Sequence, residues 1–260
     1  MNATNALPYS GDRAGNRILA SGTATSLYTV GLAATEQEIH EAQTLRFLVF
    51  NLELGEGLEE SYNTLRDEDP FDSVCDHLVV KHVPSGDIVG TYRLQTGAMA
   101  AANRGFYSAT EFEFAPFVSV LDRIVELGRA CVSSQHRNMS VLGLLWKGIL
   151  EYATARGARY LIGCSSLSST DPGTGAAAYA HLSRHGLAET RFRTRPTAAY
   201  RCPMDKVSPI APQIPKLLRA YMAMGARICG EPALDSAFGT IDFLTLHDLE
   251  TAPSRAERTR

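Results

Sequence analysis

The spacing of apolar residues changes near the middle of the chain, and this change predicts a strand, a loop and a helix in succession. Over residues 125–132, apolar side chains alternate with polar or small ones, which is typical of a strand. Residues 133–138 are polar, and from 141 to 152 apolar side chains recur at helical spacing. Such a helix begins with backbone N–H groups that lack intrahelical partners, and Ser140 is placed to cap them. The strand therefore leads into a site suited to an anion or a polar carbonyl group.

The same periodicities predict the remaining elements and their order. Thr35, with Glu38 three residues later, is typical of a capping box at the start of a helix. A turn signal at 84–87 separates two alternating segments, which predicts an antiparallel hairpin. We expect strands at 26–30, 76–82, 88–94, 125–132, 159–164 and 243–246, and helices at 35–50, 141–152, 175–185 and 217–224. This mixed order predicts an α/β fold in three layers, with helices on both faces of a mixed central sheet.

Length and composition fit one domain of this kind, which we place at 26–250, after a flexible arm at 1–25 and before a charged tail at 251–260. The 25 Lys and Arg residues nearly balance the 28 Asp and Glu residues, so the net charge of −3 predicts no nucleic-acid partner. The sequence has no apolar run of about 18 residues and no secretory signal. Its five cysteines form no CxxC pair, which favours a reducing cytoplasm and predicts no metal site.

Several charged and aromatic residues stand at positions where two interpretations remain open. Glu126 and Arg129 lie on the apolar central strand, either as catalytic groups or as a buried ion pair within the sheet. Arg46, on the apolar face of the first helix, is either the partner of an inner carboxylate or an edge residue. The acidic segment 67–72 is either a solvated loop or a carboxylate site for an amine. The aromatic residues at 106–117 either fill the core or line a tunnel for a lipid chain.

The central strand, loop and helix resemble the part of GNAT acyltransferases that holds the pantetheine arm of the acyl donor. That fold carries the signature Arg/Gln-x-x-Gly-x-Gly/Ala, which corresponds here to residues 137–142. Ser140 and Leu142 replace the two glycines, which allow the backbone to approach the pyrophosphate of coenzyme A closely. The replacement favours a donor whose 4′-phosphopantetheine is attached to an acyl carrier protein, and no permanently bound cofactor is expected.

Two further resemblances narrow the family. Residues 126–132, Glu-Leu-Gly-Arg-Ala-Cys-Val, resemble the Glu-Leu-x-Arg-x-x-Val strand of acyl-homoserine-lactone synthases and long-chain N-acyl amino acid synthases. Other positions of that superfamily are matched by Arg46, Phe50, Asp76 and Arg93. Residues 217–221, 225–235 and 238–244 resemble the C-terminal signature of bacterial L-ornithine Nα-acyltransferases, the first enzymes of ornithine-lipid synthesis.

The resemblance implies that a 3-hydroxyacyl chain passes from acyl carrier protein to the α-amine of ornithine. Because an α-amine is largely protonated near neutral pH, a base is needed, and Glu126 is the candidate. Arg129 and Arg93 are expected to keep Glu126 ionised or to bind the substrate carboxylate. Because the product is a lipid, a lyso-ornithine lipid, the enzyme is expected to act in the cytoplasm at the inner face of the cytoplasmic membrane. Whether it attaches there peripherally is left open.

The remaining candidate residues fall into a substrate group and a donor group. Substrate binding is expected at Arg46, Glu68, Asp69 and Asp76, with the backbone N–H groups of Cys131, Val132 and Ser133 facing the thioester oxygen. Contact with the carrier protein and its pantetheine arm is expected at Arg137, Asn138, Ser140, Val141, Arg191, Arg193 and Arg195. The alternative interpretation of Arg191, Arg193 and Arg195 is that they lie on a solvent-exposed edge strand with no partner. Two alternative functions remain: an N-acyltransferase that uses glycine or another amine, and a non-catalytic module that binds acyl carrier protein or lipid.

Overall fold

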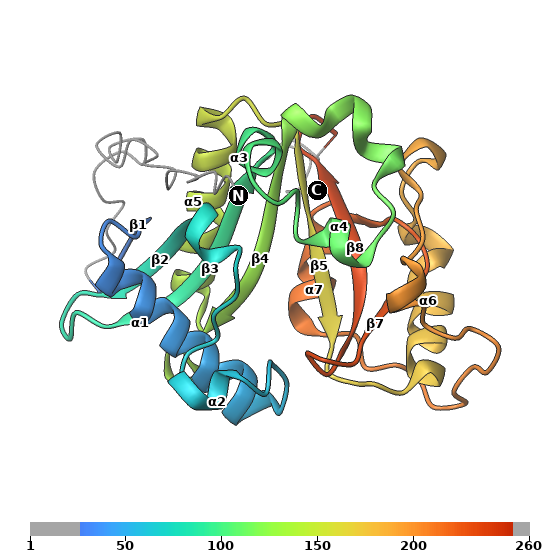
Figure 1. The fold of residues 1–260 in the computed structure, drawn as a ribbon, viewed down its shortest axis with the longest axis horizontal. Coiled ribbons are helices and arrows are strands. Elements are labelled where there is room, and N and C mark those ends of the chain that lie inside the picture. The colour runs from blue at the N-terminus through green and yellow to red at the C-terminus, as the bar shows by residue number, and fades with distance from the viewer. Residues whose placement is uncertain (1–26, 252–260) are drawn as a thin grey trace, which may run out of the picture.

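One mixed sheet organises residues 27–251, the part of the chain that the computed structural model describes (Figure 1). Within these residues eight strands follow the order β1-β2-β3-β4-β5-β8-β6, and β7 pairs with β8. The β4–β5 pair is parallel, and the other pairs are antiparallel. The strands are β1 Tyr28–Leu32, β2 Asp76–His82, β3 Ile88–Thr96, β4 Ile124–Val132, β5 Tyr160–Leu167, β6 Arg227–Ile228, β7 Ala233–Asp235 and β8 Thr240–Asp248. The arm predicted at 1–25 and tail residues 252–260 lie outside the described residues.

Helices cover both faces of the sheet, which confirms the predicted three-layer α/β fold. The helix α1 packs on β2, β3 and β4, whereas α5 packs on β1, β2 and β3 from the opposite face (Figure 1). On the α5 side, Ile241 and Phe243 of β8 pack against α6 and α7. The helices are α1 Glu36–Phe47, α2 Ser61–Thr64, α3 Gly97–Ala102, α4 Ser108–Glu111, α5 Met139–Ala155, α6 Pro172–Gly186 and α7 Lys216–Ala223. Shorter turns are the π-helical η2 Leu48–Leu54 and the 3₁₀ turns η3 Asp72–Val74, η4 Ala115–Arg123, η5 Ser134–His136, η6 Thr190–Phe192 and η7 Ala198–Tyr200.

The two helix starts predicted from sequence are found, one with a different capping residue. The Thr35 hydroxyl accepts the N–H of Glu38 at 3.2 Å, as a capping box requires, although the Glu38 carboxylate accepts the N–H of Ala34 at 2.6 Å. Asn138, and not Ser140, caps the start of α5, so the predicted capping residue was wrong by two positions. An amide oxygen in this position bonds N–H groups two and three residues ahead, which the Ser140 hydroxyl, already inside the helix, does not reach.

The aromatic residues at 106–117 are core residues. They cover the sheet face opposite α5, where Phe106, Phe112 and Phe117 are buried against Ile162 and Leu244. This packing confirms the core interpretation for these side chains. Within the same segment, α4 is a single helical turn. Two of its polar side chains, Ser108 and Glu111, are completely buried and so face the interior. Across residues 27–251, every helix is too short or too polar to cross a lipid bilayer.

Candidate active site

A cleft opens in the sheet where β4 and β5 separate. The two strands pair from Ile124–Tyr160 to Glu126–Ile162, and the sheet then splits into two walls. The cause is a β-bulge in β4: Arg93 of β3 pairs with Gly128 and Thr91 pairs with Cys131, so one residue of β3 faces two of β4. Arg129, inside the bulge, has a φ of 49°, in the left-handed region that most side chains avoid. The resulting cleft has a volume of about 330 Å³ and is lined by both strands.

Gly163 lets β4 and β5 lie close together at the point of separation, because a Cβ atom there would overlap the carbonyl oxygen of Leu127. We expect Gly163→Ala to lower the free energy of unfolding by about 1–3 kcal/mol, since the backbone must shift to accept the methyl group. The value of kcat/KM should fall with it, because the two walls of the cleft move. Denaturant unfolding and steady-state rates measure both effects.

The matched control is Gly143→Ala on α5, where an added Cβ atom meets nothing within 4 Å and the helix favours alanine. This control should keep or raise the stability. Wild-type stability and activity in Gly163→Ala would contradict the role given to Gly163.

Glu126 lies at the last paired position before the strands separate, and its carboxylate lines the cleft. Its side chain is 5% exposed. It accepts the backbone N–H groups of Tyr107 at 2.8 Å and Ser108 at 2.7 Å, as well as the Ser108 hydroxyl. Burial raises the pKa of Glu126 above its usual value, and the bonds from Ser108 and Tyr107 and the charge of Arg93 only partly offset this. The arrangement provides a carboxylate of increased basicity in a fixed position.

Next to the cleft, three arginines and three aspartates form a buried network of balanced charge. Its members are Arg46, Arg93, Arg129, Asp67, Asp69 and Asp72, each with a side chain at most 8% exposed. Arg46 bonds Asp67 and Asp72, each at 2.7 Å. Arg93 bonds Asp69 at 2.6 Å and Asp72 at 3.1 Å. Arg129 bonds Asp69 at 2.9 Å and lies 3.2 Å from Asp67, while its guanidinium stacks on Tyr107 and Phe238.

This network corrects three expectations drawn from the sequence. Arg93 and Arg129 form their ion pairs with aspartates and leave Glu126 to the donors of α4, so Glu126 is not held by direct arginine pairing. Asp69 is already bound by two arginines and cannot serve as an open carboxylate for an amine. Arg46 is the partner of inner carboxylates, as one of its two interpretations stated, and lies outside the residues that line the cleft.

Other residues predicted to bind substrate also lie away from the cleft lining. Glu68 is exposed beside Arg66 at 3.4 Å, and Asp76 accepts the Tyr152 hydroxyl at 2.8 Å. The N–H of Ser133 donates to Val89 at 2.9 Å, and Cys131, Val132 and Ser133 all lie outside the residues that line the cleft. The cleft therefore does not bring a thioester oxygen to this segment. The segment of β4 that does line the cleft is 127–130, beyond its pairing with β5.

The start of α5 is closed by its own cap. The Asn138 side chain accepts the N–H groups of Ser140 at 3.0 Å and Val141 at 3.1 Å. Arg137 forms two hydrogen bonds with Glu53 of η2, one of them at 2.8 Å. The ring of free N–H donors expected here is thus largely satisfied within the protein, which leaves little for a pyrophosphate to bind.

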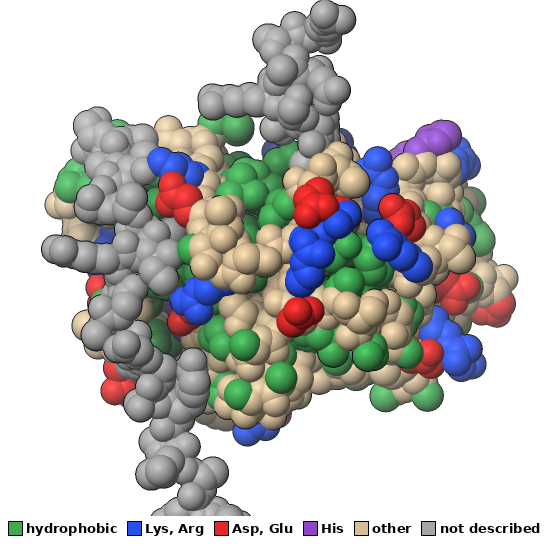
Figure 2. All heavy atoms as spheres, turned by 90° about the horizontal axis from the view of Figure 1, so that it is seen from above, with side chains coloured by type: hydrophobic (Ala, Val, Ile, Leu, Met, Phe, Trp, Pro, Cys, Tyr) green, Lys and Arg blue, Asp and Glu red, His purple; other side chains and the backbone are tan. Residues whose placement is uncertain are grey.

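The basic residues at 191–195 lie at the far end of the sheet from Arg137. Phe192 stacks on Phe117 of η4, which precedes β4, whereas Arg137 follows the end of β4, and a nine-residue strand separates the two ends by about 30 Å. Arg191 pairs with Glu189 at 2.8 Å and Arg195 with Glu113 at 2.9 Å, while Arg193 donates to the Ala188 carbonyl at 3.1 Å. Figure 2, the view from that end, shows acidic and basic side chains interspersed. These arginines and Arg137 do not form one docking surface.

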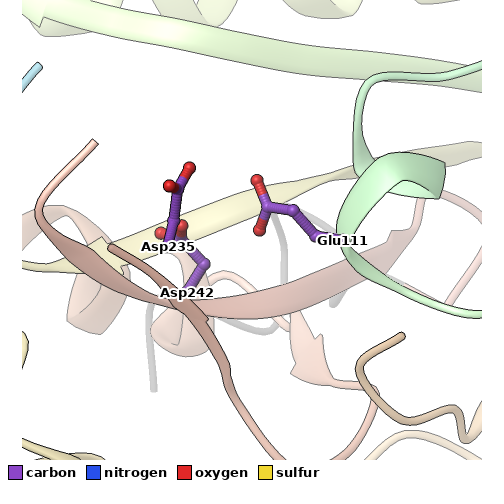
Figure 3. Close-up of side chains that lie close together, drawn as sticks. All are labelled: Glu111, Asp235 and Asp242. Atoms are coloured by element: carbon purple, nitrogen blue, oxygen red, sulfur yellow. The ribbon is translucent and has the colours of Figure 1, made fainter. Parts of the chain in front are cut away.

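A cluster of carboxylates at the cleft was not predicted. Glu111 of α4, Asp235 of β7 and Asp242 of β8 line the cleft, and one oxygen of each lies within 4.8 Å of the others (Figure 3). The side chains are 0%, 4% and 3% exposed, respectively. A sequence signal existed: two acids stand in the otherwise apolar segment 233–244, which the family resemblance covered without giving them a role.

Comparisons with known proteins agree with this fold. Residues 45–147 match a family model described as an acetyltransferase (GNAT) domain. The N-acyl amino acid synthase FeeM from uncultured soil microbes has a similar fold, with a TM-score of 0.53, 12% sequence identity, and coverage of 86% of this chain and 92% of that one.

Sequence relatives are more specific. The chain is 36% identical over 240 residues to the L-ornithine N(alpha)-acyltransferase of Agrobacterium fabrum, covering 86% of this chain and 82% of the relative. It is 32% identical over 237 residues to the protein of the same name from Rhodobacter capsulatus, covering 86% and 90%. With this identity over nearly the full length of the relatives, the chain belongs to the L-ornithine Nα-acyltransferase family.

Proposed function

We propose that this protein transfers a fatty acyl chain, of the 3-hydroxy type, from a thioester donor to the α-amine of L-ornithine and so forms a lyso-ornithine lipid. The observation that carries the proposal is the position of Glu126, a buried carboxylate of raised pKa at the point where the two walls of the cleft separate. The names of the sequence relatives support ornithine as the acceptor.

In this reaction Glu126 accepts a proton from the acceptor ammonium, directly or through a water molecule. The neutral amine nitrogen then attacks the thioester carbonyl carbon and a C–N bond forms. The nitrogen releases its second proton, the C–S bond breaks, and the departing thiolate takes up that proton and leaves as the thiol. The carbonyl oxygen gains negative charge during attack, and the candidate donors to it are backbone N–H groups of residues 127–130, which line the cleft beyond the pairing of β4 with β5. Arg129 and Arg93 line the cleft but are paired with aspartates, so the binding of the substrate carboxylate by either arginine stays a prediction.

The test is direct. Purified protein is mixed with 3-hydroxyacyl carrier protein and a panel of amino acids and diamines, and the products are identified by mass spectrometry. Acylated L-ornithine is expected. Acylation of glycine in preference to ornithine would favour the alternative acceptor, and the absence of any product would favour the non-catalytic module.

We further propose acyl carrier protein as the donor. The Asn138 side chain already occupies the N–H groups of Ser140 and Val141, where the pyrophosphate of coenzyme A would otherwise bind. A phosphopantetheine on a carrier protein has no adenosine diphosphate that needs such a site. Arg137, beside this helix start, is the candidate for contact with the carrier, and peripheral membrane contact stays a prediction.

We expect kcat/KM with acyl carrier protein to exceed that with the matching acyl-coenzyme A by at least about tenfold, which corresponds to about 1.4 kcal/mol of transition-state binding. Steady-state rates with both donors at one chain length measure the ratio. Equal use of the two donors would contradict the role given to the Asn138 cap.

A further inference from the structure

We propose that Glu111, Asp235 and Asp242 form the binding pocket for the side-chain ammonium group of the acceptor and so make the enzyme selective for a diamino acid. This inference rests on the proposed function and assigns a part of the acceptor to residues that the chemistry above does not use. The ligand class is a primary ammonium carried on a short apolar chain.

The three carboxylates reach one another from separate parts of the chain. In the β7–β8 hairpin Ala233 pairs with Asp242 and Asp235 with Thr240, so the two aspartates project from the same face of neighbouring strands. Glu111 arrives from α4, and Figure 3 shows its carboxylate pointing toward Asp235 and Asp242. The cluster thus stands inside the cleft, formed by elements of the fold and not by a loop.

Two oxygen atoms of the cluster are buried without a hydrogen-bond partner. Glu111 Oε1 and Asp242 Oδ1 accept no bond from any residue in the described range 27–251. Burial raises the pKa of Asp242 to about 6, and it raises that of Glu111 well above its usual range, with the neighbouring aspartates adding to the effect. Buried acceptors of this kind are costly when they have no donor, so the cluster is prepared for a cation that donates hydrogen bonds.

The spacing suits an ammonium group. Because the three oxygens lie within 4.8 Å of one another, a nitrogen above their plane can approach all three at about 2.7–2.9 Å, the length of a charge-assisted N–H···O bond. An ammonium nitrogen carries three N–H donors, one for each carboxylate. A divalent ion, which binds oxygen at about 2.0–2.6 Å, is the competing ligand, and the experiment below distinguishes it from an ammonium group.

The pocket is also linked to Glu126 through α4. One turn of α4 joins them: Ser108 bonds Glu126, and Glu111 follows three residues later on the same side of the helix. Side chains at this spacing stand about 5–6 Å apart. Ornithine has five bonds between its two nitrogens, so its extended chain spans about 6 Å. With the side-chain ammonium in the carboxylate pocket, the α-amine comes within reach of Glu126.

The test compares L-ornithine with L-norvaline, which has the same carbon chain and lacks the second amine. Glu111→Gln and Asp242→Asn are measured against wild type, with Asp87→Asn, an exposed residue in the β2–β3 turn, as the control. Each variant should lose about tenfold to hundredfold in kcat/KM for ornithine, mainly through KM, because a charge-assisted hydrogen bond is removed. The ratio of kcat/KM for ornithine to that for norvaline should fall by this factor in both variants, and Asp87→Asn should keep the wild-type ratio.

Four outcomes decide the matter. An equal loss for both acceptors in folded variants would overturn the proposal. If wild type acylates neither acceptor, the proposed function fails. Calorimetric titration with each amino acid then still tests the pocket. Binding of ornithine that is stronger than that of norvaline and is weakened in Glu111→Gln supports the pocket. Equal binding of the two, or none, rejects it. Stoichiometric binding of Mg²⁺ or Ca²⁺ alone, lost in Glu111→Gln and needed for activity, would replace the ammonium with a metal ion and overturn the proposal.

Discussion

Glu126→Gln is expected to lower kcat by about 10²–10⁴-fold, because glutamine keeps the shape of the side chain but cannot accept the proton of the acceptor amine. Acylation of L-ornithine by an acyl carrier protein donor, followed by mass spectrometry, measures the effect. In wild type the rate should rise as pH increases through the raised pKa of Glu126, since the base acts in its deprotonated form. The variant should lack this rise.

If the role of Glu126 is structural, a different pattern of variant effects is expected. The carboxylate accepts the N–H groups of Tyr107 and Ser108, so it also holds the start of α4. Ser108→Ala removes the hydroxyl bond and leaves the base in place, and it serves as the matched comparison. If Glu126 acted only by holding α4, the two variants would lose stability and activity in parallel. Wild-type turnover in folded Glu126→Gln would remove Glu126 as the base.

Arg46→Met is expected to destabilise the protein by about 3–5 kcal/mol, because Asp67 and Asp72 would lose a buried partner. For a chain of this size the melting temperature should fall by about 6–20 °C. Calorimetry or thermal unfolding by circular dichroism measures the change. The matched control is Arg66→Met, whose partner Glu68 is exposed, and its effect should stay within about 0.5 kcal/mol.

The same network predicts how stability depends on pH. Burial alone would raise the pKa of Asp72, but the charge of Arg46 and its hydrogen bond outweigh this and hold the pKa far below the usual range. A lowered pKa in the folded state contributes stability above the unfolded value of about 3.9, and this contribution is lost as pH falls further. Wild type should therefore lose stability more steeply below pH 4 than Arg46→Met. Equal slopes would show that the pair does not contribute in this way.

The order of the main helices and strands, and the position of Glu126 among them, could be predicted from sequence. The change from alternating to helical spacing located β4 and α5, and the position of Glu126 on an apolar strand indicated a buried carboxylate near a helix start. Thr35 located α1 because capping is a local interaction. Arg46 was recognised as a possible partner of inner carboxylates, again because one helix face is visible in the sequence.

Contacts between distant segments could not be predicted. Arg129 follows Glu126 by three residues on one predicted strand, so an ion pair between the two was one interpretation of the sequence. The bulge in β4 instead turns the Arg129 side chain toward Asp67 and Asp69, some sixty residues earlier. The carboxylate pocket depends on the register of the β7–β8 hairpin and on α4, a single helical turn within the aromatic segment 106–117. The local spacing of apolar residues predicts neither the register nor the turn.

The short ladder between β4 and β5 divides the molecule into two continuous stretches of chain, one on each side of the cleft. The earlier stretch carries Glu126, the proposed proton acceptor, and includes the match to the broad acetyltransferase model at 45–147. The later stretch carries Asp235 and Asp242 of the proposed ammonium pocket. If both proposals hold, an exchange of the acceptor amino acid needs new side chains chiefly on one hairpin near the C-terminus, while the proposed base is left as it is.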